Sequence, residues 1–410
     1  MVNKIIFAIL IALPILDYLL EQYLNHLNNT MWSDKLPEQL RGICPEEDYK
    51  KSQLYHRDKQ RLSFWSSSLN IVVILAMLIL GGFALVDTWA KEIVGDNPIW
   101  IAVVFFMIIG AASIIIDIPF EYYDTFVIEK RYGFNTMTVK MFIVDQLKSL
   151  LLSAIIGLPL FYLITWLYYK IGQPFWLYAW GVLTLFSLFF SFFYSELIVP
   201  IFNKQTPLEE GSLRTKIEDF ANRVGFALDN IFVIDGSKRS TKSNAYFTGF
   251  GSKKRIVLYD TLMNDFSDDE IVAILGHEIG HYKKRHIIWS MITSILINGL
   301  TLFIFSRVVD SQAIADAMGV EKESFHIGFI AFAILYSPLS LVIGLISNYF
   351  SRKNEYAADK FSAENYNPHF LADALKKLSI KNLSNMLPHP AYIFFHYSHP
   401  SLLQRLSRLE

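Results

Sequence analysis

The sequence is poor in charged residues and in cysteine. Charged residues make up 18% of its 410 residues, whereas soluble domains average about 25%. The single cysteine, Cys44, excludes an intrachain disulfide and a zinc site built on cysteine thiolates. The net charge of −1 offers none of the basic excess that nucleic-acid binding requires. Hydrophobic residues, at 53%, dominate what remains.

Long apolar runs account for this composition. Seven of them are long enough to cross a bilayer, which takes about 20 residues. They lie near residues 4–20, 69–87, 99–120, 149–169, 175–201, 286–306 and 327–350. The first run follows Lys4, as a signal peptide would, but no small-residue cleavage site follows it and Asp17 stands where one would begin. We therefore expect an uncleaved first span and an all-α, seven-span protein embedded in the lipid bilayer.

The basic residues of the short loops alternate between heavy and light. The odd loops carry most of them, at Lys35, Arg41, Lys50, Lys51, Arg57, Lys59, Arg61, Lys130, Arg131 and Lys140. The even loops carry few, at Lys91, Lys170, Arg307 and Lys322. By the positive-inside rule, the odd loops and the C-terminal tail are predicted to be cytoplasmic and the N-terminus to lie on the other side.

The fifth loop is the longest segment between spans. The expected divisions are 1–201 with five spans, 202–285 as a small α+β protease segment, 286–350 with two spans, and 351–410 as a tail. Within the loop, a helix is expected near 211–224, and strands are expected at Asn230–Ile234, Asn244–Gly249 and Arg255–Leu258. Ser267 and Glu270 form a capping box for a further helix. Because no proline occurs from 268 to 306, this helix is expected to run into the sixth span.

That helix contains His277-Glu278-Ile279-Gly280-His281. Residues four apart lie on one helix face, so both imidazoles can reach one Zn²⁺ ion. Glu278 points about 100° away and can contact a metal-bound water as general base. The two glycines, Gly276 and Gly280, leave room beside the helix backbone. A chance match to this pattern occurs in roughly one chain in a hundred of this length.

A catalytic zinc site needs a third protein ligand. Glu355 lies five residues beyond the seventh span, and His281 lies five residues before the sixth. One short loop joins these spans, so both residues stand roughly 7–8 Å outside the same membrane face. This matched height favours Glu355 as ligand over a surface carboxylate beside Arg352 and Lys353. Asp359 shares its helix face and can accept a hydrogen bond from a ligand histidine, although a surface ion pair is an equal alternative.

The sequence resembles the type-one CAAX prenyl protease family, which are seven-span zinc metalloproteases of the gluzincin group. The resemblance covers nearly the whole chain. Its motifs are Phe126-Val-Ile-Glu-Lys-Arg-Tyr-Gly-Phe-Asn135, Pro200-Ile-Phe-Asn-Lys204, Asp235-Gly-Ser-Lys-Arg-Ser-Thr-Lys-Ser-Asn-Ala-Tyr-Phe-Thr-Gly249, Lys254-Arg-Ile-Val-Leu-Tyr-Asp-Thr-Leu262 and Tyr397-Ser-His-Pro-Ser-Leu-Leu-Gln-Arg405. Ser401 stands where the family usually has a second proline.

The resemblance implies an architecture and a site. Seven helices would enclose a water-filled chamber, with the catalytic helices at its cytoplasmic end. Acids at span margins, such as Asp145 and Glu196, are compatible with a wet interior. The resemblance also supports Glu355 as zinc ligand and Asp359 as its neighbour, and it places His399 and Arg405 beside the active site, where either could stabilise an oxyanion. Without it, His399 and Arg405 are ordinary tail residues.

The segment that contains Asn244, Ala245, Tyr246, Phe247 and Thr248 has the pattern of an edge strand. A substrate peptide can add to such an edge as an extra strand, although a plain structural hairpin fits the same pattern.

The predicted function is cleavage near the C-terminus of prenylated CAAX-type proteins or peptides by one zinc ion. A quality-control protease for non-prenylated membrane proteins is the first alternative, and a transporter or receptor is the second. Ligands outside the apolar spans, flanked by Lys283 and Lys284, argue against a transporter. The short loops favour a bacterial inner membrane over the endoplasmic-reticulum membrane, with a cytoplasmic active site.

Overall fold

The computed structural model describes residues 1–227, 231–248 and 254–409. Its long helices account for the predicted spans. Within these residues, six helical segments are long and apolar enough to cross a membrane: α1 (Val2–Thr30), α2 (Glu46–Ile79), α4 (Pro98–Tyr123) with its π-helical end η2 (Asp124–Glu129), α5 (Val139–Ile171), α6 (Phe175–Leu197) with α7 (Val199–Phe202), and α11 (His286–Val308). A seventh is the pair α13 (Phe325–Leu335) and α14 (Ser337–Asn365), which bends by 54°. Counting this pair as one span gives the predicted seven.

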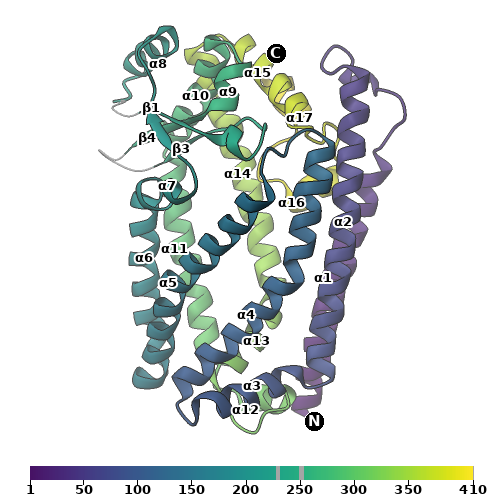
Figure 1. Ribbon diagram of the computed structural model, residues 1–410, viewed down its shortest axis with the longest axis vertical. Coiled ribbons are helices and arrows are strands. Elements are labelled where there is room, and N and C mark those ends of the chain that lie inside the picture. The colour runs from purple at the N-terminus through teal and green to yellow at the C-terminus, as the bar shows by residue number, and fades with distance from the viewer. Residues whose placement is uncertain (228–230, 249–253, 410) are drawn as a thin grey trace.

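The second span differs from its prediction. The apolar run was expected to continue to residue 87, but α2 ends at Ile79. Gly81 adopts a left-handed conformation with φ of 70°, which breaks the helix at little cost because glycine lacks a Cβ atom. The rest of the run forms the short helix α3 (Gly82–Val94), which packs on α4 at the end of the molecule opposite the sheet (Figure 1). Hydrophobicity alone does not show this break.

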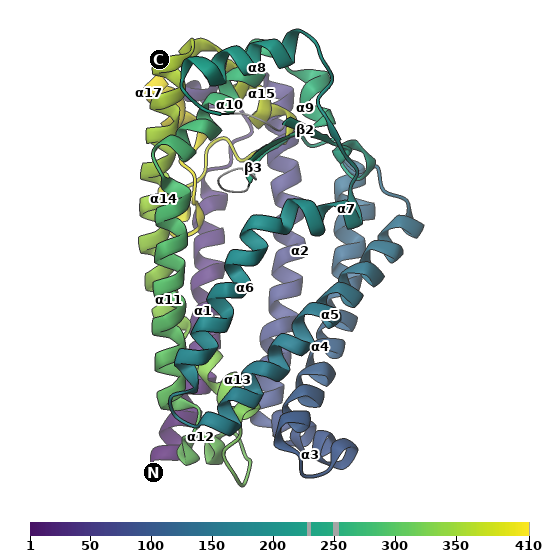
Figure 2. The same cartoon turned by 90° about the vertical axis from the view of Figure 1, so that its left-hand side faces the viewer.

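The spans enclose a chamber. A compact bundle would bury one face of every helix. Here only 6% of the most apolar stretch is buried in α1, α2, the span Phe175–Phe202 and α11. In both views the long helices stand apart from one another through the middle of the molecule (Figures 1 and 2). This low burial of the spans agrees with the chamber that the resemblance implied.

The two ends of the molecule differ in character. The N-terminus lies at the end that carries α3 and α12 (Gln312–Ala317), while the C-terminus and the sheet lie at the other end (Figure 1). The loops that follow α1, α4 and α7 reach the sheet end, as the alternation of basic loops predicted. The arrangement fixes which segments share a side of the molecule.

The described residues of the fifth loop form a four-stranded sheet with the order β1-β2-β4-β3. Its strands are β1 (Gln205–Pro207), β2 (Ile231–Ile234), β3 (Ala245–Thr248) and β4 (Arg255–Tyr259). β2 and β4 are parallel, whereas β1 pairs antiparallel with β2 and β3 antiparallel with β4. All three predicted strands are present and β3 is an edge strand, as expected. Asn230 and Gly249, at the predicted ends, lie outside the described residues, and β1 was not predicted.

Helices cover the sheet and complete the catalytic layer. The sheet and the helices α8 (Ser212–Arg223), α9 (Asp260–Asp265), α10 (Asp268–Lys283) and α15 (Pro368–Lys381) share one hydrophobic core. The remaining short elements are η1 (Glu38–Leu40), η3 (Gly236–Lys238), α16 (Pro390–His396) and α17 (Leu402–Leu409). Arg239 binds both carboxylate oxygens of Asp145, and Arg255 pairs with Glu196. Two of the acids at span margins therefore hold the sheet on α5 and α6.

The expected continuous helix through residues 268–306 is wrong. The capping box at Ser267 and Glu270 is present, but α10 ends at Lys283 and α11 begins at His286. Arg285 between them has a φ of 61°, a left-handed conformation that costs a non-glycine residue roughly 1–2 kcal/mol. The absence of proline excludes one cause of a helix break, but a residue in the left-handed conformation, such as Arg285, can still end a helix. The metal-binding motif and the membrane span therefore lie on separate helices.

Candidate metal centre

Two histidines lie on one face of α10. His277 is buried, His281 is half-buried, and their Nε2 atoms are 3.1 Å apart. The four-residue spacing places them one turn apart. Ser267 fixes the start of this helix, because its Oγ accepts a hydrogen bond from the Glu270 N–H. The predicted pair therefore converges on one point.

The third group comes from α14. Glu355 is 4% exposed, with Oε2 lying 3.3 Å from Nε2 of His277 and Oε1 lying 3.2 Å from Nε2 of His281. One ligand atom from each of the three residues lies within 4.8 Å of the others. Glu355, which was predicted from its matched height above the membrane, thus lies beside His277 and His281, which were predicted from their helical spacing.

The chemistry of this group suits a divalent cation. Two imidazoles and one glutamate form a known catalytic zinc set, which leaves one position open. Oε2 of Glu355 is buried without a hydrogen-bond partner, which is costly unless a cation compensates its charge. Burial disfavours protonated His277, but the neighbouring carboxylates of Asp359 and Glu355 outweigh burial and raise the pKa of His277 to about 9. The pocket therefore favours positive charge at the point where a metal would bind.

Two glycines allow the ligand-bearing helices to approach closely. A Cβ atom on Gly280 would lie 3.1 Å from the backbone of Ala358 on α14, and one on Gly276 would lie 2.8 Å from Oγ of Ser362. The Ser362 hydroxyl donates a hydrogen bond to the Ala273 carbonyl across the same contact. The expected room beside the helix backbone is thus filled by α14, which brings Glu355 to the histidines.

His277 is held from behind by Asp359. Nδ1 of His277 lies 2.8 Å from Oδ1 of Asp359, so a proton on Nδ1 leaves Nε2 free to bind metal. Arg405, on α17, donates from Nε to Oδ2 of Asp359 at 2.8 Å and is largely buried. Burial alone would lower the pKa of Arg405, but its bonds to Asp359 raise it above the usual value. The Arg405 guanidinium is therefore engaged on the side of His277 opposite the metal position.

Sequence reasoning missed His286. Its Nδ1 lies 3.1 Å from Nδ1 of His281, and the two rings meet edge to face with centroids 5.2 Å apart. A neutral His286 can accept the Nδ1 proton of His281, which leaves Nε2 of His281 for the metal, as Asp359 does for His277. A helical spacing of five residues would not predict this contact. It arises because Arg285 turns the chain between the two rings.

Glu278 and His399 lie nearer to solvent. Glu278 is half-buried between fully buried neighbours on α10, and in the described part of the chain no hydrogen bond or ion pair engages its carboxylate. His399 has a 64% exposed side chain, with Nε2 lying 3.4 Å from Oε1 of Glu355. The structure therefore places all of the predicted residues Glu278, Asp359, His399 and Arg405 beside the three candidate ligands.

Comparison with known proteins covers both halves of the chain. Residues 25–204 match a family model described as the CAAX prenyl protease N-terminal region with five membrane helices, and residues 207–410 match peptidase family M48. CAAX prenyl protease 1 of Saccharomyces cerevisiae is 36% identical, over 98% of this chain and 94% of that protein. The homologue from Oryza sativa is 37% identical, over 97% and 95%, and the one from Homo sapiens is 31% identical, over 100% and 96%. The chain belongs to the CAAX prenyl protease 1 family, within peptidase family M48.

A solved structure agrees with this membership. The crystal structure of S. mikatae Ste24p superposes with a TM-score of 0.93 at 36% identity and covers 99% of both chains. Family M48 is a family of zinc metalloproteases, so the predicted enzyme class, cofactor and multi-span membrane fold are confirmed. The named relatives come from eukaryotes, and this finding gives no support to the predicted bacterial source.

The close approach of α10 to α14 at Gly280 can be tested by substitution. Gly280→Ala should lower zinc affinity by about tenfold or more, because the new Cβ atom pushes the backbone of Ala358, and with it Glu355, away from the histidines. Zinc affinity is measured by competition with a chelator. Gly344→Ala is the matched control, since Gly344 lies on the same helix α14 and a Cβ atom at that position would have nothing within 4 Å. Equal affinity in both variants would contradict the packing argument.

Proposed function

We propose that His277, His281 and Glu355 hold the zinc ion and that Glu278 is the general base of a CAAX-processing endopeptidase. The convergence of three ligand atoms within 4.8 Å carries the proposal. When bound, zinc lowers the pKa of a water molecule toward about 7 and polarises a carbonyl group. Asp359 and Arg405 support this set by orienting His277.

Glu278 and His399 divide the remaining chemistry. Glu278 is free to accept the proton of the attacking water and to return it to the leaving nitrogen. His399 is exposed beside Glu355, so its ring can donate a hydrogen bond to the oxyanion that develops on the scissile carbonyl. Arg405 is the less favourable donor for that oxyanion because Asp359 already engages its guanidinium.

The edge strand β3 is the proposed docking site for the peptide. Tyr259 donates its N–H to the carbonyl of Asn244, and bonded pairs alternate along an antiparallel ladder, so Ala245 and Phe247 direct backbone groups to the free edge. The ring of Phe247 meets Tyr282, the residue after His281, at a centroid distance of 5.7 Å. A peptide added along this edge would run beside the metal helix.

The prenylated substrate is inferred from the relatives and supported by the chamber. The chain's relatives are named CAAX prenyl proteases, and an interior bordered by membrane helices gives an apolar prenyl group a place to bind, at about 0.8 kcal/mol per buried methylene. Backbone recognition by β3 demands little of side chains, which keeps the quality-control alternative open. The cytoplasmic position of the active site is inferred from the basic residues of the odd loops. The membrane in which the protein lies stays a prediction. The short loops favour a bacterial inner membrane, whereas the eukaryotic relatives favour the endoplasmic-reticulum membrane.

Glu278→Gln should retain zinc and lose turnover by about 10²- to 10⁴-fold, because it removes the base and leaves every proposed ligand in place. Bound zinc is measured by elemental analysis and turnover with a peptide substrate. Glu364→Gln, an exposed change on α14, is the control and should be as active as the native chain. A fall in turnover of less than tenfold with zinc retained would show that Glu278 is not the base.

The sidedness prediction is tested by cysteine labelling in a Cys44→Ser background. Glu210→Cys is exposed at the sheet end, and Lys322→Cys is exposed near α12 at the opposite end. In right-side-out vesicles, an impermeant maleimide should label Cys at position 322 and should reach position 210 only after permeabilisation. The reverse pattern would put the metal centre on the far side of the membrane.

The substrate proposal predicts cleavage of a farnesylated CAAX peptide after its modified cysteine, which releases the last three residues. The measurement compares farnesylated and unmodified peptides of one sequence by mass spectrometry, with Glu278→Gln as the blank. Cleavage of neither peptide by zinc-loaded enzyme would contradict CAAX processing. Equal cleavage of both would favour the quality-control alternative, because the lipid would then contribute nothing to recognition.

A further inference from the structure

Two motifs that the catalytic chemistry leaves unexplained meet in space. One follows α4 at residues 126–136, and the other precedes β3 at residues 236–243. Their backbones join through an isolated bridge between Asn135 and Ser240. Further hydrogen bonds are Thr136 N–H to the Arg239 carbonyl, Thr241 N–H to the Phe134 carbonyl, and Thr241 Oγ1 to the Gly133 carbonyl. The loop before the proposed docking strand is thus attached to the membrane-spanning half of the chain.

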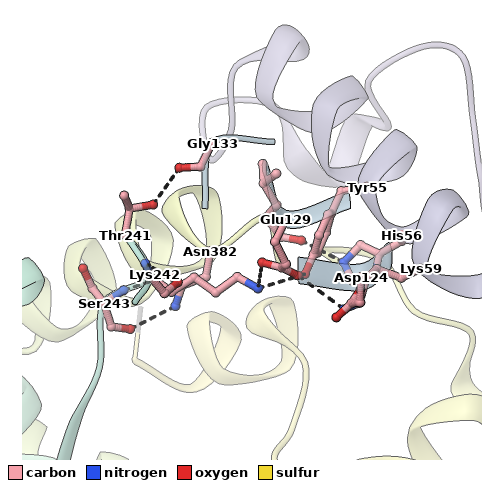
Figure 3. Close-up of polar contacts among 12 residues, drawn as sticks. Tyr55, His56, Lys59, Asp124, Glu129, Gly133, Thr241, Lys242, Ser243 and Asn382 are labelled. Carbon is pink, nitrogen blue, oxygen red and sulfur yellow. Dashed lines mark hydrogen bonds and ion pairs between the residues drawn. The ribbon is translucent and has the colours of Figure 1, made fainter. Parts of the chain in front are cut away.

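Lys242 is the charged centre of this joint. Its Nζ atom lies 2.8 Å from Oε2 of Glu129 and donates to the Tyr55 hydroxyl at 2.8 Å (Figure 3). The Tyr55 hydroxyl in turn donates to Oε1 of Glu129 at 2.6 Å. The Lys242 ammonium also lies 4.4 Å from the ring centroid of Phe134. The Lys242 ammonium group is therefore held in position by several partners, whereas an isolated surface ion pair has only one.

The acidic partner is presented by an unusual helix. Asp124 and Glu129 are the first and last residues of the π-helix η2, and both lie against Lys59, at 2.6 Å and 3.3 Å. In an α-helix, residues five apart would point about 140° away from each other, whereas a π-helix bonds residues five apart. The π turn therefore lets both carboxylates reach one side. Two acids and two lysines balance their charges at a partly buried position.

The joint leads directly into β3. The side-chain amide of Asn382, the residue after α15, makes two hydrogen bonds of 3.1 Å with the backbone of Ser243 (Figure 3). Its oxygen accepts from the Ser243 N–H, and its nitrogen donates to the Ser243 carbonyl. The Lys242 carbonyl accepts from Oγ1 of Thr261 at 2.9 Å. Asn244, which follows Ser243, begins the pairing with β4. The start of β3 is therefore held between the membrane helices on one side and the catalytic layer on the other.

We propose that Lys242 is a positioning residue for the peptide substrate, whose ion pair with Glu129 fixes where β3 begins relative to the metal centre. The inference rests on the proposed docking of substrate along β3. Register decides which residues of an added strand face which side, so a displaced β3 would present a different peptide bond to Glu278. Lys242 then acts through β3 on the choice of bond and on substrate binding, without touching the reacting atoms.

The experiment compares Lys242→Met with Lys242→Arg, which keeps the charge, and with Glu129→Gln and the Lys242→Met/Glu129→Gln double variant. Lys50→Met is the matched control, because Lys50 forms an exposed ion pair with Glu46 on α2. Each full-length, zinc-loaded protein is given a farnesylated CAAX peptide. Mass spectrometry locates the cleaved bonds, kinetics separates KM from kcat, and elemental analysis and thermal unfolding report zinc and folding.

Lys242→Met should raise KM by about fivefold or more and should add a second cleaved bond, with kcat within about twofold and zinc unchanged. Lys242→Arg should keep the single cleaved bond, and the effect of the double variant should be smaller than the sum of the two single effects, since both single changes remove the shared Lys242–Glu129 pair. A single cleaved bond with native KM, or a loss confined to kcat or zinc, would overturn the proposal. If the native chain cleaves no CAAX peptide, the proposed function fails instead, and the Lys242 comparison is made on an unmodified peptide that it does cleave.

Discussion

The metal centre depends on how closely α10 approaches α14. The histidines belong to one helix and the glutamate to the other, so the separation of the helices sets the distance between ligands. Gly276 and Gly280 remove the side chains that would hold the helices apart, and Ser362 closes the contact with a hydrogen bond to the Ala273 carbonyl. A zinc site tolerates distance errors of only about 0.2 Å. Small residues are therefore as necessary here as the ligands themselves.

The hollow interior changes how the catalytic layer is supported. In an ordinary protein the core beneath a sheet holds it in place, but here the spans bury little of their surface against one another. Besides the packing of α10 on α14, the layer is attached at its rim through Arg239 with Asp145, Arg255 with Glu196, and Lys242 with Glu129. Charged pairs suit a rim because they specify one orientation, whereas hydrophobic contacts allow sliding.

What the sequence predicted and what it missed have a common physical basis. Helical spacing is local, so His277 and His281 could be predicted directly, and span length made the height of Glu355 predictable. The missed features depend on backbone conformations that no side-chain pattern encodes. The left-handed residue Arg285 split an expected helix and created the His286 contact. The π turn at the end of α4 brought two carboxylates together that an α-helix would separate.

The turn at Arg285 also separates the helix that carries the two histidines, α10, from the membrane helix α11. Membrane helices tilt to match the thickness of the surrounding bilayer. If α10 and α11 formed one rod, a change of tilt in α11 would swing the metal ligands by the same angle. A left-handed residue between them lets the membrane helix lean while the catalytic helix stays packed on α14. A change of tilt in the bilayer would then reach the two histidines only through α14, the membrane helix that itself carries Glu355.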